Sequence, residues 1–512
     1  MSDALTLEAL LSAGADAAAA IGAPARKPLC HGELRALIAR TVASLNALSA
    51  GRNDRVAIVL PNGPEMAACF LAVASGAASA PLNPAYREEE FEFYIGDLNA
   101  KLLIAMRGVD TPARAAAKKL GVPIVELVPD ANAGAGSFTL QTTEGANANP
   151  AAPAANGGFA RPDDVAMVLH TSGTTSRPKI VPLSQSNLCA SARHIRKSLA
   201  FTPKDRGLNI MPLFHIHGLI AGVLAPLSTG SEVFCSPGFD ALKFFGWMDE
   251  CHPTWYTAVP TMHQAILTRA GRNKETIARN PLRFLRSSSS SIPPQVIAEL
   301  EAVFGAPLIE AYGMTEATHQ MASNPLPPAT RKPGSVGLAA GPEIEIMDED
   351  GKILPPDTTG EIVIRGPNVT AGYENNPKAN AEGFSNGWFR TGDQGVKDAE
   401  GYVSLTGRLK EIINRGGEKI SPREIDEVIM DHPAVAQVVC FAVPHPKLGE
   451  EVGAAVVLKE GASATEKEIQ AFVALHVADF KVPKKILILP EIPKGATGKL
   501  QRIGLAQKLG LA

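Results

Sequence analysis

Short apolar runs alternate with segments of helical periodicity along the chain up to about Gly334. Val56 to Leu60 and Val165 to Leu169 have the length and the apolar content of buried strands. Glu65 to Val73 and Asn187 to Leu199 instead repeat their apolar positions with the period of a helix. Such an alternation is typical of parallel sheets with crossover helices. The pattern therefore predicts the α/β fold class for the bulk of the chain.

Two changes of pattern divide the remainder. Residues 334–406 consist of short alternating runs separated by turn residues, which predicts a small β-rich, barrel-like subdomain. After Gly407 the chain is rich in charge and then repeats strand and helix signals. We therefore expect a large N-terminal domain over residues 1–408, built of layered α/β subdomains and including the β-rich one. A small, mobile α+β domain is expected over residues 409–512.

The segment from Pro129 to Gly158 has an unusual composition. Ala, Asn, Gly and Pro dominate it, and such residues offer little apolar surface to bury. We interpret it as a mobile surface connection.

Composition restricts the classes of partner. The chain has 512 residues, 45% of them hydrophobic and 20% charged, which is enough to bury several cores. Its net charge of −3 comes from 49 basic and 52 acidic residues that are mixed along the sequence. Because no basic block stands out, we expect no nucleic-acid partner.

Cysteine usage and the first residues bear on the compartment. Six cysteines are scattered without CxxC spacing, which favours neither a zinc site nor a disulfide framework. The first basic residue, Arg26, follows Asp3, Glu8 and Asp16, unlike the start of a signal peptide. The most apolar stretch, around residues 67–82, is interrupted by polar residues and too short to span a bilayer. These features favour a cytoplasmic protein without a membrane partner.

A loop rich in Ser, Thr and Gly follows the strand at Val165 to Leu169. It reads TSGTTSRPK and is suited to hold a polyphosphate, since the hydroxyls can donate hydrogen bonds, Gly173 permits close approach, and Lys179 adds positive charge. The hydroxyl groups belong to Thr171, Ser172, Thr174 and Thr175. An ordinary polar loop would explain the composition but not the preceding strand or the placed lysine. No GxxxxGK[ST] arrangement is present, which argues against a P-loop ATPase or kinase.

Seven ordered motifs, including this loop, give the chain a resemblance over nearly its whole length. It is similar to the adenylate-forming superfamily of acyl-CoA synthetases, coumarate-type ligases, luciferases and peptide-synthetase adenylation domains. The matching segments are TSGTTSRPK, PLFHIHG, EAYGMTEAT, GEIVIRGPNVTAGY, GWFRTGD, GRLKEIINRGGEKISPREID and PKGATGK. The first departs from the family pattern at two positions, because Ser176 and Ile180 replace glycines.

The resemblance implies roles for the polar residues of these motifs. Glu316, with Thr175, would hold Mg²⁺, and Lys499 would bridge the substrate carboxylate and the α-phosphate of ATP. Asp393 would accept hydrogen bonds from the ribose hydroxyls, with Arg408 beside it. Walls of the adenine and nucleotide site would come from Ser289, Glu310, Ala311, Tyr312, Gly313 and Thr315. Tyr312 could equally be a core residue.

The second half-reaction, with the thiol of coenzyme A, requires a changed site. The family rotates its C-terminal domain about a hinge that maps to Lys410. The rotation would withdraw Lys499 and bring Gly416 and Gly417, which lack side chains, beside the pantetheine arm. The co-substrates implied are ATP and coenzyme A, with Mg²⁺ as cofactor, and the protein is expected to be a monomer or a weak homodimer.

Two sequence segments resemble most closely those of the oxalate–CoA ligases of plants and fungi. They read TWYTAVPTMHQ and EAYGMTEATHQMASNPLP. Oxalate is a small dianion that needs polar donors, and His215, His217, Ser289 and His319 offer them. A packed core histidine is the alternative reading of His215. The alternative substrates are a 4-coumarate-like or a medium-chain fatty acid, whose ligases need an apolar pocket.

Three other classes compete with a ligase. A kinase or ATPase would release ADP and phosphate, whereas a ligase of this kind releases AMP and pyrophosphate. A peptide-synthetase loading domain would need a carrier domain, and the chain ends soon after Lys499. A protein that only binds ligands would tolerate the loss of that lysine.

Overall fold

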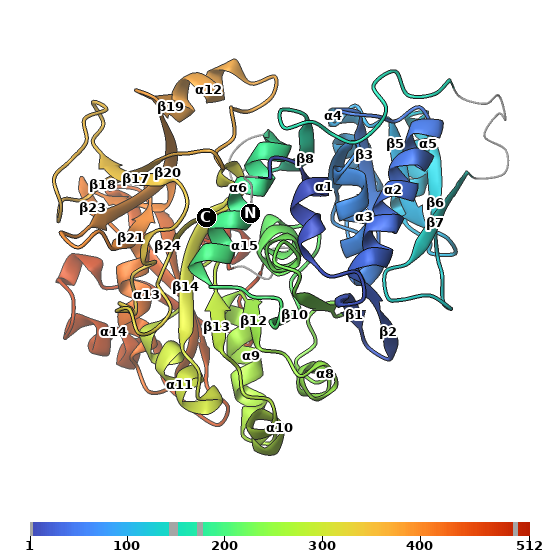
Figure 1. Ribbon diagram of the computed structural model, residues 1–512. Helices are drawn as coiled ribbons and strands as arrows, with labels where there is room; N and C mark the ends of the chain where they lie inside the picture. Colours follow the sequence, from blue (N-terminus) through green and yellow to red (C-terminus); the bar gives the residue numbers. More distant parts are fainter. Residues whose placement is uncertain (1–3, 143–151, 172–177, 495–499) are drawn as a thin grey trace.

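The computed structural model describes residues 4–142, 152–171, 178–494 and 500–512. A seven-stranded and a nine-stranded sheet dominate it, and both are largely parallel (Figure 1). The seven-stranded sheet has the order β7-β6-β5-β3-β4-β8-β9. Its strands are β3 (Arg55–Val59), β4 (Ala78–Pro81), β5 (Leu102–Met106), β6 (Ile124–Pro129), β7 (Phe138–Thr142), β8 (Val165–His170) and β9 (Ile180–Ser184).

The central strand β3 shows why this sheet reads as continuous apolar runs. Val56 and Ile58 point into the core shared with the second sheet, whereas Ala57 and Val59 pack against α4 (Glu88–Asp97) and α5 (Pro112–Lys119). Helices therefore cover both faces, so both sets of alternate positions are apolar. The strand and helix predictions in this region are confirmed, and α3 (Pro64–Ala74) is buried along its whole length.

The nine-stranded sheet has the order β16-β15-β14-β13-β12-β10-β11-β1-β2. Its strands are β1 (Ala19–Ala23), β2 (Arg26–Cys30), β10 (Arg206–Asn209), β11 (Glu232–Cys235), β12 (Trp255–Ala258), β13 (Phe284–Ser287), β14 (Leu308–Met314), β15 (His319–Ser323) and β16 (Leu338–Ala339). Trp255 and Phe284 lie in the shared core. Tyr256 and Leu285, one position later, pack outward against the helices that cover the other face. These helices are α8 (Phe244–Cys251), α9 (Pro260–Ala270) and α11 (Pro294–Phe304).

The layer between the two large sheets also contains α2 (His31–Ala47), α6 (Gln185–Ser198) and a π-helix, η2 (His217–Leu224). Wide π-helical turns are rare and occur mostly at functional sites. This π-helix begins at one of the histidines predicted to contact the acid. Within the described ranges, none of the helices is both long and apolar enough to cross a membrane.

Two smaller five-stranded sheets follow in the chain. The first is antiparallel and contains β17 (Glu343–Met347), β18 (Gly360–Arg365), β19 (Phe384–Ser385), β20 (Trp388–Lys397) and β21 (Val403–Arg408), where the β-rich subdomain was predicted. The second contains β22 (Ile413–Arg415), β23 (Glu418–Ile420), β24 (Val435–His445), β25 (Gly449–Leu458) and β26 (Lys485–Ile488), covered by α13 (Pro422–Met430) and α14 (Glu466–Ala474). The mixed α/β fold class, with a large N-terminal part and a smaller α+β C-terminal part, is thus confirmed.

The interpretation of residues 129–158 as a mobile connection is wrong for part of that segment. Strand β7 pairs with β6 in antiparallel register, from Pro129 opposite Phe138 to Val125 opposite Thr142. Phe138 is buried in the shared core, and Ala135 is also buried. The pairing with β6, the burial of Phe138 and the hydrogen bond from the N–H of Ala135 to the carbonyl of Lys27 order this stretch despite its small residues. Residues 143–151 lie outside the described ranges.

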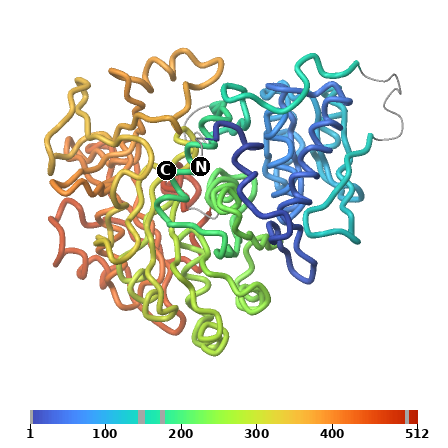
Figure 2. Tube along the Cα trace, in the orientation of Figure 1, coloured from blue at the N-terminus to red at the C-terminus, as the bar shows by residue number. Residues whose placement is uncertain are grey.

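The C-terminal part rests on the N-terminal part, as the orange and red segments of Figure 2 show beside the yellow and green ones. The hydroxyl of Ser421 donates to the carbonyl of Thr406, and Arg423 donates to the carbonyl of Leu405 at 2.6 Å. Farther away, the amide of Gln295 on α11 donates to the carboxylate of Asp431. These contacts fix the arrangement of the two parts in this structure.

Candidate active site

The residues at the base of the predicted phosphate loop are part of a β-hairpin. His170 pairs with Ile180 across β8 and β9, and the N–H of Thr171 donates to the carbonyl of Lys179 at 3.0 Å. Thr171 and Lys179 are therefore held together at the base of the loop. The other predicted loop residues, Ser172, Gly173, Thr174 and Thr175, lie outside the described residues, as does Lys499.

Glu316, the predicted metal ligand, lies in a short 3-10 turn, η3 (Thr315–Ala317), directly after β14. Its side chain is 6% exposed, and Oε1 accepts a hydrogen bond of 2.8 Å from the hydroxyl of Tyr373. Burial raises the pKa of Glu316 above its ordinary value, since desolvation disfavours the charged form. Among the described residues no arginine or lysine forms an ion pair with Glu316, and such a buried carboxylate suits a hard cation that brings its own charge and waters.

The predicted ribose residues form one cluster. Asp393 on β20 is opposite Arg408 on β21, and Nε of Arg408 donates to Oδ1 of Asp393 at 2.8 Å. The hydroxyl of Tyr312 donates to Oδ2 of the same carboxylate. The neighbouring Asp393 charge raises the pKa of Arg408 above its ordinary value. Each carboxylate oxygen keeps a further lone pair, so ribose hydroxyls can still donate to Asp393. Tyr312 is buried, but its hydroxyl belongs to this polar cluster rather than to an apolar core.

Strand β14 carries Glu310, Ala311, Tyr312 and Gly313 to this cluster. Gly313 is required sterically, because a Cβ atom there would lie 1.7 Å from the carbonyl oxygen of His319. Glu310 is buried and accepts hydrogen bonds from the N–H of Gly334 and the amide of Asn324. Burial raises the pKa of Glu310 to about 8.

The predicted acid residues converge on the start of the π-helix. Nδ1 of His217 lies 3.1 Å from the hydroxyl of Ser289, and its Nε2 lies 2.7 Å from Oγ1 of Thr257. The ring of His319 stacks on that of His217 with centroids 4.8 Å apart. His215 is half-buried, and its Nδ1 accepts from the N–H of His217 at 3.3 Å. The structure thus brings all four predicted residues to one place.

At the centre of this group is Arg286, a residue that the sequence reasoning missed. It lies on β13, is 0% exposed, and is opposite Thr257 of β12. One guanidinium nitrogen lies 3.3 Å from Nε2 of His217, and the other lies 3.1 Å from Nε2 of His319 and 3.3 Å from Oε1 of Gln320. An arginine in an otherwise apolar strand, directly before the Ser287 to Ser291 run, is a signal that could have identified it.

The hydrogen bonds of Arg286 determine the state of the histidines. A guanidinium only donates, so Nε2 of both His217 and His319 must accept, and each ring is neutral with its proton on Nδ1. The partners found for Arg286 among the described residues are uncharged, and its Nε has none of them within hydrogen-bond reach. Burial lowers the pKa of Arg286 to about 9, so it remains a cation at neutral pH. The group of predicted acid residues, called the acid pocket below, therefore contains a buried positive charge that a carboxylate can neutralise.

The predicted hinge residue Lys410 lies in a 3-10 turn, η4 (Leu409–Glu411), between β21 and β22. The next residue, Glu411, forms an ion pair of 3.2 Å with Arg502, which also contacts Asp426 of α13 at 2.6 Å. Gly416 and Gly417 make the tight turn between β22 and β23 with φ of 60° and 104°. Within the described residues, no contact joins either glycine to the predicted acid residues. The rotation that would move them stays a prediction.

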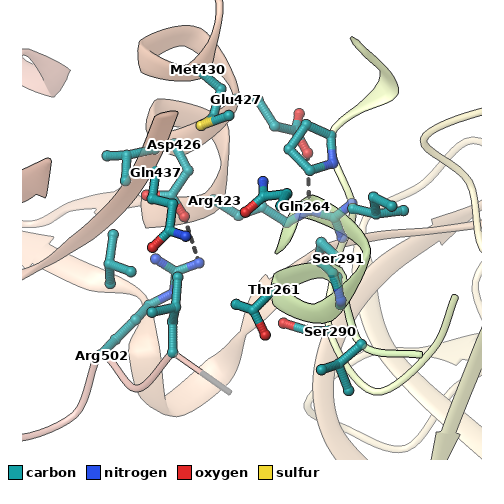
Figure 3. A pocket seen from close by; sticks show the side chains of 17 residues that line it. Thr261, Gln264, Ser290, Ser291, Arg423, Asp426, Glu427, Met430, Gln437 and Arg502 are labelled. Atoms are coloured by element: carbon teal, nitrogen blue, oxygen red, sulfur yellow. Dashed lines mark hydrogen bonds and ion pairs between the residues drawn. The ribbon is translucent and has the colours of Figure 1, made fainter. Parts of the chain in front are cut away.

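A cavity of about 120 Å³ lies between the C-terminal part and the segment that follows Ser289 (Figure 3). Thr261 of α9 and the hydroxyls of Ser290 and Ser291 line one side, and Arg502, paired with Asp426, lines the other. Leu500, which directly follows Lys499, also lines it. Leu500 and Arg502, which follow the predicted catalytic lysine, thus line the same cavity as Ser290 and Ser291, the two residues directly after the predicted acid residue Ser289.

Comparison with known proteins agrees with this arrangement. A model of the AMP-binding enzyme family matches residues 9–374, and one of the AMP-binding enzyme C-terminal domain matches residues 424–499. An oxalate–CoA ligase from Arabidopsis thaliana is 47% identical over 485 residues, covering 94% of this chain and 93% of that protein. One from Saccharomyces cerevisiae is 42% identical over 478 residues, covering 89% and 87%.

Among solved structures, ATP-bound MatB from Rhodopseudomonas palustris superimposes with a TM-score of 0.86. It is 30% identical in sequence, and the match covers 99% of this chain and 98% of that one. The family models, the relatives and the fold all agree, and the chain belongs to the family of AMP-binding enzymes.

Proposed function

We propose that the chain is an AMP-forming acid–CoA ligase that converts oxalate, ATP and coenzyme A into oxalyl-CoA, AMP and pyrophosphate. The observation that carries the proposal is the buried Arg286, whose charge has only neutral partners among the described residues. Oxalate attacks through one carboxylate and keeps a second one on the adjacent carbon. That second carboxylate is the counter-charge that the pocket lacks.

In the first half-reaction, a carboxylate oxygen attacks the α-phosphate of ATP and pyrophosphate leaves. Lys179 and Thr171 support the phosphates at the loop base, and Asp393 with Arg408 orients the ribose. Glu316 would hold Mg²⁺, which neutralises charge on the phosphates when bound. Lys499 supplies positive charge between the attacking carboxylate and the phosphorus.

In the second half-reaction, the thiol of coenzyme A attacks the acyl carbonyl and AMP leaves. The sulfur is provided by the substrate, and the five buried cysteines of this chain are poor nucleophiles. Burial, for example, raises the pKa of Cys189 to about 12. His215 would border the carboxylate site and help the thiol to reach it. Rotation about Lys410 would exchange Lys499 for the turn at Gly416 and Gly417.

The same pocket argues against the alternative acids. A coumarate or medium-chain fatty acid presents an apolar tail, which would have to pack against Arg286 without supplying a counter-charge. Keeping a buried charge without an opposite charge costs several kcal/mol, on the order of 3–5. A two-carbon dianion has no such mismatch.

A substrate panel tests the proposal. Thioester formation with ATP, Mg²⁺ and coenzyme A is measured for oxalate, malonate, sulfoacetate, acetate, octanoate and coumarate, and the nucleotide products are separated. We expect oxalate to give the highest kcat/KM, with AMP and pyrophosphate as products. ADP and phosphate would overturn the ligase assignment, and a clear preference for octanoate or coumarate would overturn the oxalate assignment alone. The cytoplasmic location and the monomer or weak homodimer stay predictions.

A further inference from the structure

Tyr373 lies between two groups of opposite charge in the phosphate and metal region. Its hydroxyl donates to Oε1 of Glu316 at 2.8 Å. Nζ of Lys179 lies over the other part of the same side chain, 4.3 Å from the ring centroid. An aromatic face attracts a cation, while a phenolic hydroxyl donates to an anion. One side chain therefore contacts both the predicted phosphate lysine and the predicted metal carboxylate.

Hydrogen bonds to one asparagine fix both the N–H and the carbonyl of Tyr373. Its N–H donates to Oδ1 of Asn380 at 2.7 Å, and its carbonyl accepts from Nδ2 of the same asparagine at 2.8 Å. Asn380 belongs to α12 (Pro377–Gly383). The ring is 8% exposed and packs against Phe389 with centroids 6.3 Å apart. The position of the ring is thus set by its own surroundings rather than by a ligand.

Lys179 and Glu316 would attract each other strongly in a site as buried as this one. No ion pair within 4.0 Å joins these two described residues, although they are close enough for the charge of Lys179 to act on Glu316. Tyr373 satisfies each of them separately. A direct pair would occupy the lysine that phosphates need and the carboxylate that a cation needs, so their separation keeps both available.

We infer that Tyr373 is a positioning residue for adenylate formation: its ring holds Lys179, its hydroxyl holds Glu316, and the two are thereby kept apart for the phosphates and for Mg²⁺. The inference rests on the proposed function, which gives these two groups their ligands. The two contacts use different parts of the side chain, so the hydroxyl contact can be removed while the ring contact is kept.

Two substitutions separate the contacts. Tyr373→Phe removes the hydroxyl and keeps the ring, whereas Tyr373→Leu removes both. With pyrophosphate release as readout, we expect Tyr373→Phe to raise the Mg²⁺ concentration for half-maximal rate by about tenfold, because a hydrogen bond to a charged group is lost. Its KM for ATP at saturating Mg²⁺ should change little. Tyr373→Leu should raise both quantities.

A second readout distinguishes positioning from general damage. Thioester formation from a supplied acyl-adenylate involves neither Mg²⁺ nor pyrophosphate, so both variants should keep it. Tyr402→Phe is the matched control, because Tyr402 is similarly buried and its hydroxyl donates to the carbonyl of Thr330 at 2.6 Å, outside the proposed site. It should leave the Mg²⁺ dependence unchanged.

Two results would overturn the inference. One is a wild-type Mg²⁺ dependence in Tyr373→Phe, and the other is an equal loss in both half-reactions. Should Tyr373→Leu fail to fold, Tyr373→Phe alone decides. If the wild-type protein itself releases no pyrophosphate, the proposed function fails, and that outcome is recognised before any variant is compared.

Discussion

Replacing Arg286 by methionine tests the acid pocket most directly. Methionine is unbranched and flexible, so it can fill much of the same volume without a charge. The substitution removes the guanidinium that lies within 3.3 Å of His217, His319 and Gln320. We expect the variant to lose activity with oxalate selectively, because only a dianion has a second carboxylate that can pair with the guanidinium.

The expected loss follows from the burial of Arg286. The side chain is 0% exposed, so its interaction with a carboxylate is screened little by water. Removing one partner from a buried, hydrogen-bonded charge pair costs about 2–5 kcal/mol. At about 1.4 kcal/mol for each factor of ten, kcat/KM for oxalate should fall roughly 30- to 5,000-fold. Acetate, which lacks a second carboxylate, should lose little.

The assay compares kcat/KM for oxalate and acetate in the wild type and the variant. Arg283→Met is a matched control, because Arg283 also lies beside β13 but forms its ion pair with Asp205 at 3.0 Å. The control should change the oxalate to acetate ratio little, whatever it does to stability. An equal loss for both acids in Arg286→Met would refute the reasoning and assign Arg286 a purely structural role.

Three further predictions concern other parts of the molecule. Lys499→Ala should nearly abolish pyrophosphate release yet leave thioester formation from a supplied adenylate largely intact, and an equal loss in both would contradict the two-conformation scheme. Burial raises the pKa of Glu310 to about 8, so between about pH 5 and 8 the folded state keeps a proton that the unfolded chain releases. The free energy of unfolding should therefore fall with rising pH by up to about 1.4 kcal/mol per unit, and Glu310→Gln should remove that slope in chemical denaturation. Arg502→Gln leaves the half-buried Asp426 without its ion-pair partner and should cost about 1.5–3 kcal/mol in thermal unfolding, while Arg365→Gln, at an exposed ion pair, should change stability little.

Much of the fold and the order of the site motifs could be predicted from the chain itself. Residues that act within one motif, such as Glu316 in YGMTE, are close in sequence and keep a recognisable spacing. Strands that are covered on both faces appear as apolar runs, and β3 and β8 were predicted for this reason.

Arg286 and Tyr373 were missed because their partners are distant in sequence. Arg286 meets His217 across 69 residues, and Tyr373 meets Glu316 across 57. Such contacts depend on which strands become neighbours and in which register, and neither is encoded in a local pattern. The order within residues 129–158 was missed for a similar reason, since Phe138 becomes buried only when β7 finds the edge of β6.

Strand β1 has a consequence for how this molecule can be divided. It lies parallel to β11, with Ile21 opposite Val233, so the chain contributes to the nine-stranded sheet before it builds the seven-stranded one. No single cut in the backbone can separate the two large sheets. Deleting the first thirty residues would uncover β11 as a free edge, open to pairing with another chain. Going along the chain, a fragment that keeps both large sheets whole can therefore end at the connection Leu409–Glu411.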